Sequence, residues 1–228
     1  MPKISKRLKQ AKQEYDVQKR YAPAEAIQLV KKLAQIKFDA GVEVHLHLGI
    51  DPKKSDQMVR GTTILPHGTG KKKRIIAFVG PQKEQEAKDA GADIIGDEET
   101  IQSIKTTKKI AADLAVATPD MMKKLAPVAK ILGQKGMMPN PRTETVSMNI
   151  GETIKEIKAG KKIAFKTDTT GNIHQLIGRI SFSEPQLQEN LETFLEVVKK
   201  LKPEGMKGTY IQSASLCTTM GPAIRFTM

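Results

Sequence analysis

The feature that most constrains this chain is a hydrophobic pattern that changes twice along its length. In the segment VEVHLHLGI, residues 42–50, apolar and polar side chains alternate without interruption. Such alternation predicts a strand with one buried and one wet face, as in an antiparallel sheet that is covered on one side only. The expected buried face comprises Val42, Val44, Leu46, Leu48 and Ile50, and the wet face Glu43, His45 and His47.

Beyond PHGTGKKKR, residues 66–74, continuous apolar runs replace the alternation, with helical segments between them. Strands buried on both faces and joined by short helices indicate β-α-β units around a parallel sheet. These strands and helices are expected at 75–79, 82–91, 92–95, 98–109 and 114–117. The segment 129–146 is rich in Gly and Pro and is expected to be a structured loop, and a following helix over 151–160 ends at Gly160.

Alternation returns after residue 160. Ile163 and Phe165 are expected in one short strand, and a helix is predicted from Pro185 to Lys202, as another is from Pro23 onward. The last strand is expected at 209–219, with a short return at 223–226. A further strand is expected to carry four residues on one face: Leu176, Gly178, Ile180 and Phe182.

Because the two ends of the chain look alike and the middle differs, the pattern predicts an α+β split domain formed by both termini and interrupted by an α/β domain. The expected boundaries are 1–68 plus 160–228 for the discontinuous domain and 69–159 for the insertion. The two chain crossings would form a double hinge, where glycine allows the backbone to turn cheaply. The expected hinge residues are Gly68, Gly70, Ala159 and Gly160.

The net charge of +13 indicates a polyanionic partner, because self-repulsion of this size destabilises a compact chain. Residues 1–37 hold ten Lys and Arg against three Asp and Glu, a net +7. A solubilising tail is one interpretation of this arm, and a nucleic-acid patch accounts for it better. An anionic membrane surface is the other candidate partner, although no apolar run approaches the ~20 residues that span a bilayer.

The aromatic and cysteine content narrows these options. Aromatic residues make up 4% of the chain and Trp is absent, which favours recognition of folded RNA by phosphates, sugars and shape over stacking of single strands. Cys217 is the single cysteine, so no internal disulfide is possible. The basic N-terminus has no apolar stretch behind it, and we therefore expect no secretory signal and a cytoplasmic location.

Catalytic alternatives find little support, so no enzyme, cofactor or metal site is expected. His45 and His47 form a His-x-His pair beside Glu43 and could ligate a metal, but a polar strand surface is the simpler interpretation. The segment HGTGKKK suggests a phosphate loop for a nucleotide enzyme. Leu65 stands where that loop needs its first Gly, and Lys72 where it needs Ser or Thr for magnesium.

Two segments allow both a structural and a binding interpretation. Phe38 follows Lys37 at a helix–strand junction, where a Phe is usually a core residue. Glu43 could accept hydrogen bonds from base edges or ribose hydroxyls, or simply face solvent. In CTTMGPAIR, the Met220-Gly221 pair could form a plain hairpin turn or allow close approach of a sugar-phosphate chain.

Four segments carry a resemblance to a known family, over essentially the whole chain and in the family's order. They are KFDAGVEVHLHLGIDPKKSDQMVRGTTILPHGTGKKKR, AKILGQKGMMPNPRTETV, FKTDTTGNIHQLIGRISF and KGTYIQSASLCTTMGPAIR. They resemble bacterial-type large-subunit ribosomal protein L-one, a universal stalk protein family, and LPHGTG, GMMPNP and TTMGP are the most specific motifs.

The resemblance implies a fold in which the split domain carries the main RNA contact and a hinge links it to an inserted Rossmann-like three-layer domain. It implies binding to large-subunit (23S-type) rRNA at the mobile stalk near the tRNA exit site, with help in the release of deacylated exit-site tRNA. It also implies translational repression through the protein's own operon mRNA. The expected protein is a monomer within the cytoplasmic ribosome, with no membrane partner.

Residue by residue, the resemblance implies an RNA-binding set. The matching positions are Lys37, Phe38, Glu43, Asp168, His174, Ser213, Thr218, Thr219, Met220 and Gly221. The chain departs from the family pattern at a few positions, each followed by the family's usual residue in parentheses: Gly41 (Thr or Ser), Thr167 (Asn), Thr169 (Lys) and Gln134-Lys135 (Pro-Arg).

Overall fold

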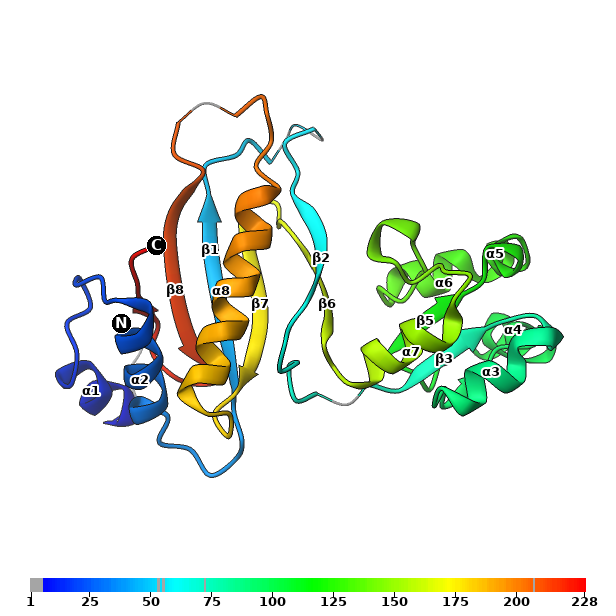
Figure 1. The fold of residues 1–228 in the computed structure, drawn as a ribbon, viewed down its shortest axis with the longest axis horizontal. Coiled ribbons are helices and arrows are strands. Elements are labelled where there is room, and N and C mark those ends of the chain that lie inside the picture. Colours follow the sequence, from blue (N-terminus) through cyan, green and yellow to red (C-terminus); the bar gives the residue numbers. More distant parts are fainter. Residues whose placement is uncertain (1–5, 53, 55, 72, 207) are drawn as a thin grey trace. The chain divides into compact units, whose positions relative to one another are not determined.

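The computed structural model describes residues 6–52, 54, 56–71, 73–206 and 208–228 (Figure 1). The chain divides into two compact units, one combining Met1–Gly70 with Ala164–Met228 and the other comprising Lys71–Ile163. Each unit contains helices and strands, so the expected mixture of α and β structure is confirmed. The assignment of two domains at 1–68 plus 160–228 and 69–159 stays a prediction.

The first unit is built on an antiparallel sheet with the strand order β7-β1-β8-β9. The strands are β1 (Gly41–Leu48), β7 (Asn172–Arg179), β8 (Ile211–Thr218) and β9 (Ile224–Arg225). Strand β1 comes from the first part of the chain and lies between two strands from the last part (Figure 1). Neither part of the chain can therefore form this sheet alone.

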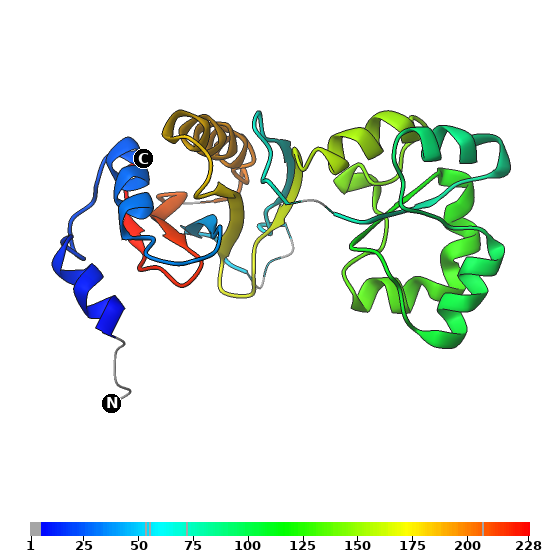
Figure 2. The ribbon, with the colours of Figure 1, turned by 90° about the horizontal axis from the view of Figure 1, so that it is seen from below.

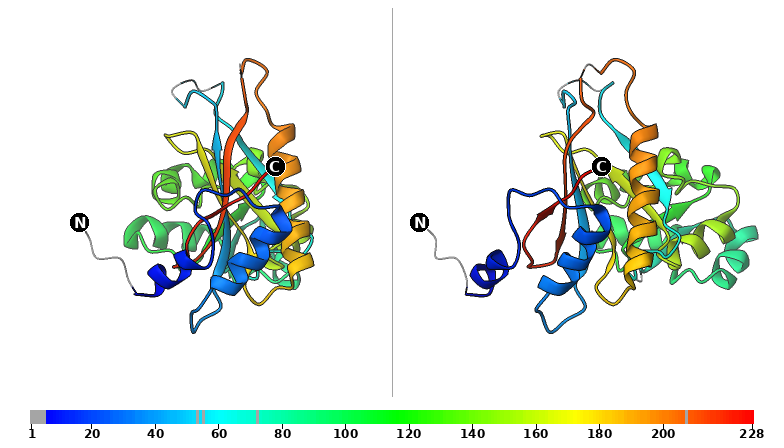
Figure 3. Two further views of the ribbon diagram at one scale, coloured as in Figure 1. Left: turned by 90° about the vertical axis from the view of Figure 1, so that its left-hand side faces the viewer. Right: turned by 60° about the vertical axis from the view of Figure 1, so that its left-hand side comes forward.

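Strand β1 confirms the alternation expected from the sequence. Its residues Val42, Val44, Leu46 and Leu48 are at most 1% exposed, whereas the intervening polar side chains are half-buried. The helices α2 (Pro23–Leu33) and α8 (Glu184–Lys200) lie on one face of the sheet and cover the apolar side (Figures 2 and 3). The opposite face keeps its polar side chains.

The prediction for β7 is wrong in its register. Leu176 is paired with Glu43 on the polar face, and Gly178 is paired with Val42 on the apolar face. A β-bulge causes the difference, because the extra residue, Ile177, shifts the alternation by one position. The fully buried side chains of β7 are Ile173 and Ile177, and the strand ends before Ile180 and Phe182.

The second unit contains a parallel sheet with the order β4-β3-β5, as the continuous apolar runs predicted. Ile76 and Phe78 of β3 enter one hydrophobic core, and Ile75 and Ala77 enter another on the opposite face. Helices therefore lie on both sides of this sheet (Figure 2). The elements are β3 (Ile75–Phe78), α3 (Glu84–Asp89), β4 (Ile94–Ile95), α4 (Glu98–Thr107), β5 (Leu114–Ala117), α5 (Pro119–Leu125), α6 (Ala129–Gln134) and α7 (Ile150–Lys158).

Some elements differ from expectation. The segment predicted as a loop at 129–146 begins with helix α6, because Leu132 is fully buried and good helix formers surround the single Gly133. The pattern analysis also missed α1 (Lys6–Gln13) and strand β2 (Arg60–Ile64), which pairs with β6 (Lys162–Lys166). Over the described parts of the chain, no helix is both long and apolar enough to cross a lipid bilayer.

The expected hinge glycines adopt backbone conformations that other residues rarely reach. Gly68, Gly70 and Gly160 have φ values of 66°, 68° and 68°, and Gly160 follows Ala159, the C-cap of α7. Gly68 is also fastened to α8, because the fully buried Asn190 side chain donates to its carbonyl at 2.9 Å. A hinge at these positions stays a prediction.

Candidate nucleic-acid interface

The uncovered face of the first unit's sheet carries polar side chains in rows that the strand register sets. Paired positions of an antiparallel sheet point to the same face, so each row takes one residue from β7, one from β1 and one from β8. The rows are Asn172–His47–Ser213, His174–His45–Ser215 and Leu176–Glu43–Cys217. Three of the expected RNA-binding residues, Glu43, His174 and Ser213, thus share this face.

A turn after β8, from Thr218 to Gly221, is fastened to the first residue of β1. The Thr219 amide donates to the Gly41 carbonyl at 3.0 Å, and the Gly41 amide donates to Thr219 Oγ1 at 3.2 Å. The Gly221 amide donates to the Thr218 carbonyl at 2.8 Å. Thr219 remains exposed, whereas Thr218 is only 3% exposed, so Thr218 contributes to the shape of the turn more than to its surface.

Met220 presents an apolar side chain from a strained backbone. Its φ of 68° lies in the left-handed region, which costs a residue with a Cβ about 1–2 kcal/mol. The side chain is 67% exposed, and the carbonyl accepts a 2.7 Å hydrogen bond from Arg7 of α1. Backbone strain combined with an exposed hydrophobic group is typical of binding sites.

Gly221 leaves no room for a side chain. A Cβ at this position would lie 2.1 Å from Thr218 Oγ1. Any larger residue would therefore force the turn to change shape, and glycine keeps the backbone of residues 220–221 accessible.

Phe38 is 53% exposed, and the interpretation of this residue as part of the core is wrong. Ala40 of the loop between α2 and β1 and Val42 of β1 fill the buried positions, both 0% exposed, and Phe38 and the neighbouring Lys37 stay on the surface. Phe38 precedes Gly41 by three residues, so the chain holds it within about 10 Å of the anchor of the Thr218–Gly221 turn. The two exposed apolar side chains thus belong to the same end of the sheet.

The glycine at position 41 is explained by its neighbours. A Cβ at Gly41 would lie 2.6 Å from Cδ1 of Leu176, the residue that the β-bulge turns onto the polar face. A Thr or Ser at position 41 would therefore require the end of the Leu176 side chain to move. The hydroxyl at this end of the sheet comes instead from Thr219, which is bonded to the Gly41 amide.

Asp168 lies at the other end of the sheet, before β7, and His174 lies in the middle, opposite His45. The Asp168 carboxylate accepts hydrogen bonds from the Asn172 amide (2.7 Å), the Thr170 amide (2.9 Å) and Thr170 Oγ1 (2.7 Å). These bonds, led by the one from the Asn172 backbone, hold the pKa of Asp168 well below its usual range. These bonds close a turn before β7, as is common for Asp. The preceding Thr167 is buried and donates through Oγ1 to the Val59 carbonyl at 3.2 Å.

The structure thus separates the expected residues into two groups. Lys37, Phe38 and Glu43 gather near the Thr218–Gly221 turn, whereas Asp168 and Ser213 lie toward the other end of β1, about 20 Å away by the rise of its residues from Gly41 to His47. Sequence reasoning missed Arg7, whose contact with Met220 joins positions 213 residues apart and has no local signal.

Comparison with known proteins identifies the family of this chain. The model of the family described as "Ribosomal protein L1p/L10e family" matches residues 30–222. A protein named Large ribosomal subunit protein uL1 from Mesoplasma florum is 48% identical over 225 residues, which cover 99% of this chain and 98% of the relative. The proteins of the same name from Flavobacterium psychrophilum and Thermobifida fusca are 48% and 46% identical, covering 98% and 97% of this chain and 97% and 94% of the relatives. The resemblance seen in the sequence is confirmed, and the chain belongs to the ribosomal protein L1p/L10e family.

Proposed function

We propose that this chain is a structural constituent of the large ribosomal subunit in the cytoplasm and binds 23S-type rRNA through one end of its antiparallel sheet. The observation that carries the proposal is that two exposed apolar side chains, Phe38 and Met220, lie on segments that meet at Gly41. Loops positioned by a rigid sheet are common sites of recognition.

Affinity and specificity would come from different groups. The net charge of +13 supplies phosphate contacts, which are strong but independent of sequence. Lys37 and Arg7 place part of that charge beside the turn. Phe38 and Met220 can lie on bases or sugars, while Glu43 and the exposed Thr219 hydroxyl can read polar edges. The close approach at Gly221 would admit the RNA backbone.

The test is filter binding of the full-length protein to an rRNA stalk fragment. Phe38→Ala and Met220→Ala are each expected to weaken binding roughly tenfold, because a stacked base contributes about 1–3 kcal/mol. Neither side chain is needed for the core, so both variants should stay folded. Met148→Ala, a change at an equally exposed methionine of the second unit (61%), is the matched control and should bind normally. If both test variants bind like the wild type, the turn is not the interface.

Polar contacts at the same turn predict smaller effects. Thr219→Val removes a hydroxyl worth ~1 kcal/mol and should weaken binding several-fold. Gly221→Val should weaken it more, because the added side chain collides with Thr218. Lys37→Ala should instead lower the slope of log K against log salt by about 0.9, as expected for one lost phosphate contact.

The family resemblance extends the proposal to two further roles. At the mobile stalk near the exit site, the protein would assist the release of deacylated tRNA, and by binding its own operon mRNA it would repress translation. If one surface serves both RNAs, the stalk fragment should displace the mRNA leader, and Phe38→Ala should weaken both complexes equally. Ribosomes reconstituted without the protein should release deacylated tRNA more slowly than ribosomes that contain it.

A further inference from the structure

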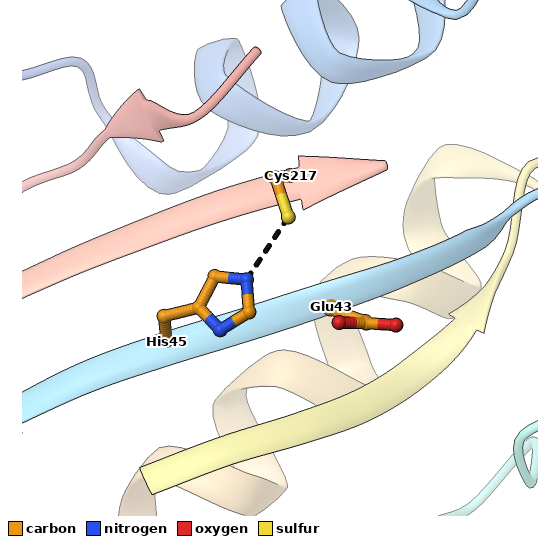
Figure 4. A group of neighbouring side chains, drawn as sticks. All are labelled: Glu43, His45 and Cys217. Carbon is orange, nitrogen blue, oxygen red and sulfur yellow. Dashed lines mark hydrogen bonds between the residues drawn. The ribbon is translucent and has the colours of Figure 1, made fainter. Parts of the chain in front are cut away.

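Three side chains with metal-binding atoms meet on the polar face of the sheet. Glu43 and His45 of β1 and Cys217 of β8 each offer one ligand atom, and these atoms all lie within 4.8 Å of one another. Figure 4 shows the group, with the His45 ring on β1 and the Cys217 sulfur on the neighbouring β8. His45 Nε2 is 2.9 Å from Cys217 Sγ. All three residues are half-buried, so solvent reaches the group while the strands hold it in place.

A second pair of contacts orients the His45 ring. His45 Nδ1 is 2.8 Å from His174 Nδ1, and His174 Nε2 is 3.7 Å from the Asp168 carboxylate. The negative charge of Asp168 favours a proton on His174 Nε2, which leaves His174 Nδ1 as an acceptor. His45 then donates through Nδ1, and its Nε2 lone pair faces the sulfur. Metal-binding histidines are commonly oriented in this way by a partner on the other ring nitrogen.

We propose that Glu43, His45 and Cys217 form a binding site for a divalent transition-metal ion of the zinc class, with water as the fourth ligand. Thiolate, imidazole and carboxylate are the ligands that Zn²⁺ takes in proteins, usually in a tetrahedron. Typical bond lengths of 2.0–2.3 Å would place the nitrogen and sulfur about 3.5 Å apart. The 2.9 Å pair therefore has to open by about 0.6 Å when the ion replaces the thiol proton.

The charges of the ligands favour a divalent cation at this site, although the protein as a whole is strongly basic. The Glu43 carboxylate and a Cys217 thiolate together carry two negative charges, which balance those of the ion. Burial and then Glu43 raise the pKa of the Cys217 thiol, so the thiol is protonated at neutral pH. Burial and then His174 lower the pKa of His45, while Glu43 raises it, and the net lowering favours the neutral imidazole that a metal binds. Binding therefore breaks one S–H bond, forms one metal–sulfur bond and releases one proton to solvent.

The ligand set differs from the His-x-His pair that the sequence made conspicuous. His47 Nδ1 is 2.7 Å from Asn172 Oδ1, and its register partners are Asn172 and Ser213. The residue that lies close to His45 is Cys217, not His47, and it is 172 residues from His45 along the chain. His47 thus provides an internal control on the same strand face.

The experiment is a titration of the untagged full-length protein with Co²⁺, followed by displacement with Zn²⁺. One equivalent of Co²⁺ should produce a thiolate-to-cobalt charge-transfer band, and Zn²⁺ should abolish it. Cys217→Ser should remove the band. His45→Asn and Glu43→Gln should weaken Zn²⁺ binding in a chelator competition, the former by at least ~100-fold, because outer-shell partners alone cost 10–100-fold. His47→Asn should bind as tightly as the wild type.

His174 is a positioning residue in this scheme, and its variants separate orientation from mere packing. His174→Gln keeps an acceptor for His45 Nδ1 and should bind Zn²⁺ nearly normally, whereas His174→Leu should lose about tenfold or more. The absence of the thiolate band at one equivalent of Co²⁺, in protein whose circular dichroism is native, would overturn the proposal. So would unchanged Zn²⁺ affinity in folded His45→Asn protein. None of these readouts depends on RNA binding.

Discussion

The sheets β7-β1-β8-β9 and β4-β3-β5 differ in how many of their faces are covered. In the second unit, alternate residues of β3 enter two hydrophobic cores, so the parallel sheet is buried on both sides. In the first unit, α2 and α8 cover one side of the antiparallel sheet, and the other side keeps Glu43, His45 and His47. Of these two sheets, only the half-covered one can therefore present side chains of its strands to a partner, whereas the unit with the fully covered sheet can present only its loops and helices.

The largest change in unfolding free energy is expected when one buried ring is removed from the core of each unit in turn. Phe194→Ala removes a fully buried ring that packs edge-to-face on Phe165, and Phe78→Ala removes one from the core of the second unit. Each should cost its own unit about 3–5 kcal/mol of unfolding free energy. Tyr15, Tyr21 and Tyr210, the only tyrosines, all belong to the first unit and report on it alone.

Urea unfolding followed by tyrosine fluorescence distinguishes independent from coupled units. If the units unfold independently, Phe194→Ala should lower the urea midpoint of the tyrosine fluorescence and Phe78→Ala should leave it unchanged. Circular dichroism reports on both units and should detect the destabilisation in either variant. An equal shift of the tyrosine signal in both variants would show one cooperative structure and contradict the assignment of two domains.

A smaller loss is expected at a buried polar side chain of α8, a helix that covers the apolar face of the antiparallel sheet. Asn190 is 0% exposed, donates to the carbonyls of Gly68 and Ile177, and accepts from the His67 amide. Asn190→Leu should destabilise the first unit by ~3 kcal/mol, because two buried carbonyls and the part-buried His67 amide lose their partner. Glu196→Ala, a change at an exposed residue of the same helix, should alter the unfolding free energy by less than about 0.5 kcal/mol. Equal stability of the two variants would show that the Gly68 anchor is unimportant.

Met220→Gly should separate folding from recognition. Relief of the left-handed backbone, ~1 kcal/mol, nearly cancels the greater freedom of glycine in the unfolded chain, so stability should change by less than about 0.5 kcal/mol. RNA binding should nevertheless weaken as in Met220→Ala, because the exposed thioether is lost. A clear loss of stability in thermal unfolding would mean that the Met220 side chain has a structural role.

The smallest effect concerns acid stability at the far end of the sheet. The pKa of Asp168 is depressed, chiefly by the Asn172 amide, so its contribution to stability is complete above the carboxyl's ordinary range and is lost as pH falls toward the folded-state pKa. Asp168→Asn should therefore lower stability slightly at pH 7 and have less effect at pH 3. Unfolding curves at the two pH values check the sign, and a larger effect at pH 3 would contradict it.

Local patterns predicted the sheets, because covered and uncovered faces leave different periods in the sequence. The alternation at Val42–Leu48 and the continuous run at Ile75–Phe78 reflect burial on one and two faces. The bulge at Ile177 could not be predicted, since it is defined by the partner strand and reverses the face of Leu176 without a local signal.

The proposed binding surface was harder to predict from the sequence than the fold. Family resemblance pointed to Phe38 and Met220, but pattern alone assigned Phe38 to the core, because a hydrophobic residue at a junction usually is buried. The contact of Arg7 with the Met220 carbonyl and that of His45 with Cys217 join residues more than 170 positions apart. Such contacts depend on strand order and register, which no local window contains.

The position of β8 beside β1 has a consequence for folding during translation. During translation β1 emerges early and has to wait until nearly the whole chain has left the synthesising ribosome before β8 can pair with it. The intervening segment Lys71–Ile163 is contiguous and can complete its own sheet meanwhile. An incomplete nascent chain therefore lacks the Thr218–Gly221 turn, which can form against Gly41 only when nearly the whole chain has been synthesised.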